Sequence, residues 1–126
     1  MKVMLVDEGA VRLRVREALA ETGSVEVRVC APDGLTAHDE VLARVRGLRP
    51  DAVVMNMSMP GGGTLHLIER IKALDSAPVV AVFSSTSSVT YRTLCCRAGA
   101  EYFFDLTRGQ EELTAVMSRL EREVPC

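Results

Sequence analysis

The sequence predicts a flavodoxin-like α/β fold, a doubly wound (βα)5 three-layer sandwich with a five-stranded parallel sheet in the order 2-1-3-4-5. Three observations predict it. Short apolar runs alternate five times with segments of helical periodicity, the connections between them are short, and 126 residues with 48% hydrophobic content suit one domain. We therefore expect a single domain over residues 1–124, with no linker, internal repeat or output domain.

Five short apolar runs predict the strands. The second run alternates valines with Glu26 and Arg28, which is typical of a strand with one solvated face near the edge of a sheet. The third and fourth runs are apolar throughout, as expected for strands buried on both faces. The predicted strands are Lys2–Val6, Val25–Cys30, Ala52–Met55, Val79–Phe83 and Tyr102–Phe104.

Five other segments have apolar residues at helical spacing, as Leu65, Ile68 and Ile71 illustrate. The segment Val89–Arg97 has the weakest pattern, because two threonines and two cysteines interrupt it. Gly99 follows this segment and is a typical signal for the end of a helix. The predicted helices are Ala10–Glu21, His38–Leu48, Leu65–Leu74, Val89–Arg97 and Glu111–Glu123.

Composition and charge exclude several classes of protein. A net charge of −2 argues against a basic nucleic-acid surface, so we expect no nucleic-acid partner. The longest apolar run, Val79–Phe83, is too short to span a bilayer, and the N-terminus lacks the layout of a signal peptide, so we expect a cytoplasmic protein without membrane contact. The four cysteines form no CxxC pair, which argues against a zinc site or a disulfide framework.

Polar residues follow the predicted strands where the chain leaves the sheet. Asp7 and Glu8 follow the first strand, Asn56 the third, Ser84 the fourth and Asp105 the fifth. Ligands of doubly wound folds bind beyond the carboxyl ends of the strands. We therefore expect two acids, a carboxamide and a hydroxyl to share one cleft.

At this point the sequence resembles a bacterial response-regulator receiver domain over essentially its whole length. Three stretches carry the resemblance: Val3–Glu8, Pro50–Gly61 and Ala98–Asp105. The strongest is the second, because Met59-Pro60-Gly61 after the third strand is a hallmark of that family.

The resemblance implies roles for particular positions. In the family an aspartate that ends the third strand accepts a phosphoryl group from a histidine kinase, and here that position holds Asn56. A lysine after the fifth strand contacts the phosphoryl group, and here that position holds Leu106. The family's hydroxyl is kept as Ser84, and Phe103 stands where the family carries a switch aromatic residue.

The same resemblance implies a magnesium site. The acidic pair is kept as Asp7 and Glu8, and the ligating backbone carbonyl would be that of Ser58. Asn56 removes one charged oxygen ligand, so we expect weak Mg²⁺ binding and no required cofactor. The loss of one acid and one base together leaves the site at a formal charge of −2, the same as in the family, which indicates a site adapted to work without phosphorylation.

We expect a stand-alone, degenerate receiver that is not an enzyme and acts through protein–protein contact in a two-component pathway or phosphorelay. A working receiver with weakened Mg²⁺ binding and a flavodoxin-like ligand-binding domain are the alternatives. The expected partner is a histidine kinase or another signalling protein, or a second copy in a homodimer.

In the family, partners dock on the face made by the fourth helix, fifth strand and fifth helix. Residues expected there are Tyr91, Arg92, Leu94, Cys95, Glu101, Asp105, Glu112 and Arg119.

Overall fold

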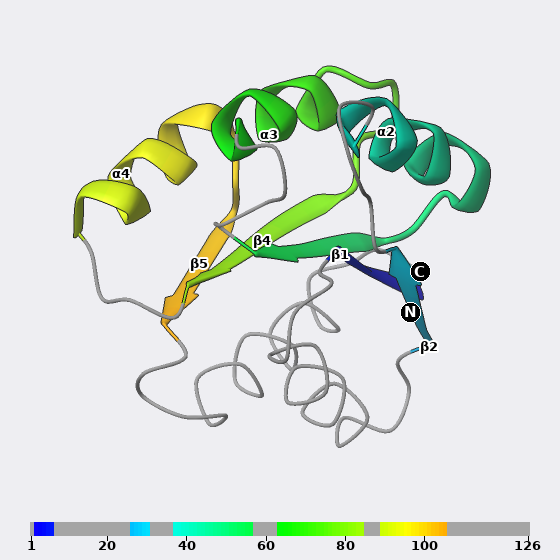
Figure 1. Cartoon of the computed structure of the whole chain (residues 1–126), viewed down its shortest axis with the longest axis horizontal. Coiled ribbons are helices and arrows are strands. Elements are labelled where there is room, and N and C mark those ends of the chain that lie inside the picture. Colours follow the sequence, from blue (N-terminus) through cyan, green and yellow to red (C-terminus); the bar gives the residue numbers. More distant parts are fainter. Residues whose placement is uncertain (1, 7–25, 31–36, 57–62, 85–88, 106–126) are drawn as a thin grey trace.

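The computed structural model describes residues 2–6, 26–30, 37–56, 63–84 and 89–105, and every structural statement below concerns these residues. They form five strands and three helices, and from β2 onward the described strands and helices alternate (Figure 1). The elements are β1 (Lys2–Val6), β2 (Glu26–Cys30), α2 (Ala37–Leu48), β3 (Ala52–Asn56), α3 (Thr64–Lys72), β4 (Val79–Ser84), α4 (Val89–Ala98) and β5 (Tyr102–Asp105).

The strands form one parallel sheet in the order β2-β1-β3-β4-β5, which confirms the predicted α/β class, the parallel sheet and its strand order. The predicted solvated strand, β2, is at one edge, and its Glu26 and Arg28 side chains are exposed and paired with each other. Strands β3 and β4 lie inside the sheet, and their consecutive apolar residues, Ala52–Met55 and Val80–Phe83, are all buried, as is usual for inner strands of a parallel sheet.

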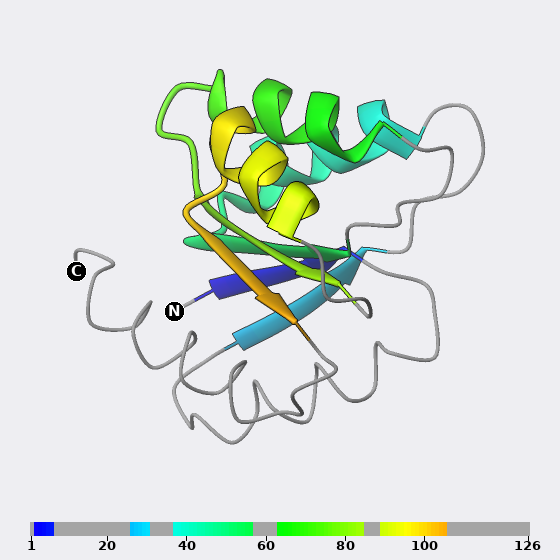
Figure 2. The ribbon, with the colours of Figure 1, turned by 90° about the vertical axis from the view of Figure 1, so that its left-hand side faces the viewer.

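Helices α2, α3 and α4 lie together on one face of the sheet (Figures 1 and 2). Their apolar faces pack on every second strand residue, such as Val53 and Met55 of β3 and Val82 of β4. The helices predicted over Ala10–Glu21 and Glu111–Glu123 lie outside the described residues, so a helical layer on the other face stays a prediction. None of the described helices is long and apolar enough to cross a bilayer.

The three helices differ in how firmly the core holds them. Helix α3 buries four side chains, those of Thr64, Leu67, Ile68 and Ile71, whereas α4 buries only Cys95. Apolar side chains stay exposed on α4: Val89 is 80% exposed, Tyr91 44% and Leu94 37%. The weak helical pattern of this segment thus corresponds to a helix with a narrow buried face.

A polar connection ties α3 to the amino ends of β4 and β5. The Glu101 carboxylate accepts a hydrogen bond of 2.6 Å from the Val80 backbone N–H and pairs with the Lys72 ammonium. The Glu101 N–H donates to the Val80 carbonyl at 2.9 Å, and Lys72 Nζ donates to the Pro78 carbonyl at 2.9 Å. The Lys72 stem crosses directly over Gly99, whose φ of +117° turns the chain from α4 into β5.

This geometry predicts that Gly99→Ala destabilises the protein by about 1–3 kcal/mol. The backbone conformation disfavours any side chain, and an added Cβ would lie 2.9 Å from Lys72 Cγ. Gly47→Ala is the matched control, because it lies within α2 and a Cβ there meets nothing within 4 Å. We expect Gly47→Ala to stabilise the protein by about 0.5–1 kcal/mol. Urea unfolding of both variants measures the two effects, and equal free energies of unfolding would contradict the assignment.

Candidate functional site

The sheet brings together the ends of the strands that carry the predicted site residues. Asn56 is the last residue of β3, Ser84 of β4 and Asp105 of β5. In the parallel register Asn56 is opposite Phe83, and Ser84 is opposite Asp105. All three residues therefore lie at the carboxyl edge of the sheet. Ser84 is one residue further along β4 than Phe83, which pairs with Asn56.

Asn56 and Ser84 differ in their surroundings. Ser84 is buried, whereas Asn56 is half-buried. The alternation along β4 places Ser84 with Val82, on the face that carries α3 and α4. Met55 faces the helices, so the side chain of the next residue, Asn56, is on the opposite face of the sheet. Both groups are neutral at every physiological pH, so this part of the edge offers a carboxamide and a hydroxyl but no carboxylate nucleophile.

Several predicted site residues are outside the described residues. These are Asp7, Glu8, Ser58, Leu106, Glu112 and Arg119, and for Asp105 only the backbone is described. The described residues contain no group of three His, Cys, Asp or Glu side chains able to hold a metal ion. The described donors at the carboxyl edge are therefore insufficient by themselves for Mg²⁺, which binds through charged carboxylate oxygens.

Phe103 links this edge to helix α4. Its ring is buried, and the Arg92 guanidinium lies over it at 5.5 Å from the ring centroid. A cation over an aromatic face at this distance contributes about 0.5–1 kcal/mol at an exposed site. The sequence singled out both residues separately but did not predict their contact, which joins positions eleven apart through the packing of α4 on β5.

The expectation that Cys95 lies on the partner-docking surface was wrong. Its side chain is fully buried against the sheet, because it occupies the narrow inner face of α4. Burial, with a smaller contribution from Cys96, raises the pKa of the Cys95 thiol to about 11. Tyr91, Arg92 and Leu94 are exposed as expected, and so is Cys96.

A protein-family comparison gives the family directly: residues 3–118 match the response regulator receiver domain. The chain belongs to the response regulator receiver family. A receiver is the signalling module of two-component systems, so the sequence resemblance is confirmed at the level of family and fold. The matched range includes Asn56 and Leu106.

Curated relatives are similar over almost the whole chain. It is 35% identical over 125 residues to protein-glutamate methylesterase/protein-glutamine glutaminase 3 of Rhodospirillum rubrum, covering 98% of this chain and 32% of that protein. It is 32% identical to response regulator MprA of Mycobacterium avium, covering 97% of this chain and 51% of MprA. The receiver thus spans about a third of the esterase and about half of MprA.

Solved structures show the same fold at low identity. Chemotaxis response regulator CheY4 of Vibrio cholerae aligns with a TM-score of 0.78 and 20% identity over 94% of this chain and 97% of that one. The isolated REC domain of RcsB from Salmonella enterica serovar Typhimurium, determined with the phosphomimetic BeF3−, aligns with a TM-score of 0.81 and 15% identity. That alignment covers 100% of this chain and 91% of the RcsB domain.

The two adjacent cysteines of α4 should differ in reactivity. Thiolates are the reactive form, so the raised pKa and burial should keep Cys95 unreactive at pH 8, whereas Cys96 should be alkylated by iodoacetamide. Mass spectrometry of the peptide that holds both residues measures this. In Cys96→Ser the native peptide should stay unlabelled until urea exposes Cys95. Rapid labelling of the native Cys96→Ser variant would contradict the burial of Cys95.

Proposed function

We propose that this chain is a receiver module that signals through protein contact and is not phosphorylated by the aspartate route. The observation that carries the proposal is Asn56 at the carboxyl end of β3, the position at which the family carries its acceptor aspartate. The sequence adds Leu106 at the position of the family's lysine.

The chemistry of Asn56 supports this proposal. A carboxylate attacks phosphorus and forms an acyl phosphate. The amide nitrogen of Asn56 has its lone pair delocalised into the carbonyl, so the side chain is not a competent nucleophile at that step. Leu106 offers neither a charge nor a donor to a phosphoryl oxygen. Both changes weaken the same reaction.

The metal site is proposed to be weak for a related reason. Asp7 and Glu8, with the backbone carbonyl of Ser58, would hold Mg²⁺, and bound Mg²⁺ would supply positive charge to a phosphoryl oxygen. Asn56 contributes a neutral oxygen in place of a charged one, so affinity should be lower than with a full set of carboxylates. No step of the proposed signalling requires the ion.

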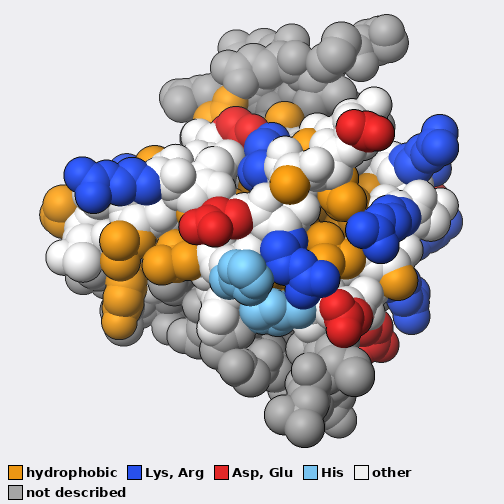
Figure 3. Space-filling view, turned by 90° about the horizontal axis from the view of Figure 1, so that it is seen from above, with side chains coloured by type: hydrophobic (Ala, Val, Ile, Leu, Met, Phe, Trp, Pro, Cys, Tyr) orange, Lys and Arg blue, Asp and Glu red, His pale blue; other side chains and the backbone are white. Residues whose placement is uncertain are grey.

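The surface of α4 is the proposed site of partner contact. Figure 3 shows apolar side chains gathered at the α4 end of the helical layer, whereas lysines and arginines gather toward the α2 end. The exposed Val89, Tyr91 and Leu94 supply apolar area, and Arg92 supplies charge beside it. Such a surface suits a modest interface with a histidine kinase, another signalling protein or a second copy of the chain.

The first prediction from this proposal is that acetyl phosphate with Mg²⁺ leaves the protein unmodified. Intact mass spectrometry should show no labile phosphoryl adduct, because position 56 holds a carboxamide. A receiver with an aspartate at this position, treated in parallel, is the positive control. A phosphoryl adduct on this chain that neutral hydroxylamine removes, as it removes an acyl phosphate, would show that the chain is a working receiver.

The second prediction is that Asn56→Asp makes stability depend on Mg²⁺. The new carboxylate would join Asp7 and Glu8 without a compensating lysine, and this repulsion should cost roughly 1–4 kcal/mol. Mg²⁺ at a hundred times its dissociation constant should restore about 2.7 kcal/mol. Thermal unfolding with and without Mg²⁺ measures both effects. Equal melting temperatures for the two proteins under both conditions would refute the expected crowding of charge.

The third prediction concerns α4. Val89→Glu should weaken partner binding or self-association at least tenfold while leaving the melting temperature nearly unchanged, because Val89 is 80% exposed. Arg92→Glu should also weaken binding, but it removes the contact with Phe103 as well. Ala43→Glu, on an exposed position of α2, is the matched control. Sedimentation and pull-down results identical for Val89→Glu and Ala43→Glu would show that α4 is not the contact surface.

A further inference from the structure

A pocket of about 550 Å³ opens at the amino edge of the sheet, away from the candidate site. Its base is formed where the chain enters β3 and β4, at Pro50, Asp51 and Pro78, and its walls are the ends of α2 and α3. Asp51 and Asn56 are five positions apart in the sequence, which is about 16 Å along a strand. The pocket is therefore distinct from the carboxyl edge, and its volume lies in the range of small-molecule sites.

Two unusual backbone conformations meet in this pocket. Arg49 has a φ of +49° and Ser76 a φ of +56°, and among the described non-glycine residues only these two have positive φ values. Both line the pocket. Arg49 ends α2, with its N–H bonded to the Val45 carbonyl at 2.9 Å, a position that glycine usually occupies without strain. A residue other than glycine is strained at such a position, so the presence of arginine there points to a function for its side chain.

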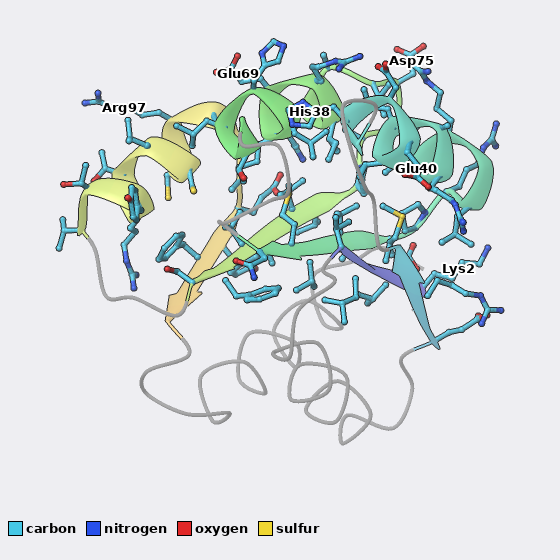
Figure 4. The ribbon with its side chains drawn as sticks, in the orientation of Figure 1. Lys2, His38, Glu40, Glu69, Asp75 and Arg97 are labelled. Atoms are coloured by element: carbon cyan, nitrogen blue, oxygen red, sulfur yellow. The ribbon has the colours of Figure 1, made fainter. Side chains whose placement is uncertain are left out.

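The charges of the pocket come from opposite walls. Arg46 and Arg49 come from the end of α2, whereas Asp75 comes from the turn after α3, which Figure 4 shows beside the end of α2. Within the described part of the chain, none of these three side chains takes part in a salt bridge. Val45, Leu74 and the two prolines add apolar side chains to the lining.

We propose that this pocket binds a small apolar zwitterion of about the size of a dipeptide. The two guanidinium groups would receive its carboxylate, because arginine binds carboxylates through paired, charge-assisted hydrogen bonds. The Asp75 carboxylate and the Ser76 hydroxyl would receive its ammonium group. Val45 and Leu74 would cover its hydrocarbon body. This site is independent of phosphorylation and of the proposed α4 contact.

The probe that tests the proposal is the dipeptide Leu-Leu with free termini, titrated into ¹⁵N-labelled full-length protein. Saturable amide shifts are expected for Arg49, Asp75 and Ser76, with Asn56 and Ser84 unchanged. N-acetyl-Leu-Leu lacks the ammonium group and Leu-Leu amide lacks the carboxylate, so each should bind at least tenfold more weakly. Absence of saturable shifts with Leu-Leu would overturn the proposal, and so would equal affinity for the three probes.

Two variants separate binding from folding. Arg49→Gly removes one guanidinium and suits the positive φ, so it should raise the melting temperature while weakening Leu-Leu binding at least tenfold. Arg46→Ala should also weaken binding, whereas Arg44→Ala, on the same helix but outside the pocket, should not. Unchanged affinity in both Arg49→Gly and Arg46→Ala would overturn the assignment of the carboxylate to these arginines.

Discussion

The rest of the structure depends on the pairing of β3 between β1 and β4. Asp51, just before β3, fixes this register at the amino edge: its N–H donates to the Lys2 carbonyl at 2.9 Å, and its carbonyl accepts from the Val79 N–H at 3.1 Å. Its carboxylate also accepts from the Lys2 N–H at 2.8 Å. A slip of one residue would turn every buried side chain of β3 to the other face, so the register is strongly specified. Asn56 reaches the carboxyl edge as a consequence of that pairing.

The sequence predicted the fold well because the strands inside a parallel sheet are unbroken runs of apolar residues. Its errors lie at element ends and in contacts between distant residues. The third and fourth strands each continue one residue further than predicted, to the polar Asn56 and Ser84, because backbone pairing and not hydrophobicity ends a strand. Helix α3 ends at Lys72, two residues earlier than the apolar pattern suggested, because Leu74 packs against the core from the turn that follows the helix.

The candidate site was predictable only in part. The positions of Asn56 and Ser84 follow from strand order, but the contact of Arg92 with Phe103 joins a helix to a strand that no local pattern relates. Cys95 was assigned to the surface because a weak helical pattern does not fix which face is buried. The buried face of α4 became clear only from its packing on the sheet.

Among the described elements, the buried sheet contrasts with helix α4, which has a single buried side chain. The sheet carries Asn56 where the family carries its reactive aspartate, and among the three described helices α4, with one buried side chain, is best able to adjust when a partner binds. The receiver that we propose keeps the family's scaffold and takes an input that needs no carboxylate at β3.

The central claim is that the carboxyl edge no longer accepts a phosphoryl group, and the most direct test is a titration with BeF3− and Mg²⁺ followed by ¹⁵N amide spectra. BeF3− mimics a phosphoryl group by bonding to a carboxylate oxygen, which Asn56 lacks. We expect unchanged amide signals at Asn56, Ser84 and Phe103 in the chain with Asn56, and shifts at Ser84 and along α4 in Asn56→Asp. Saturable shifts at Asn56 and Ser84 in the chain with Asn56 would contradict the proposal.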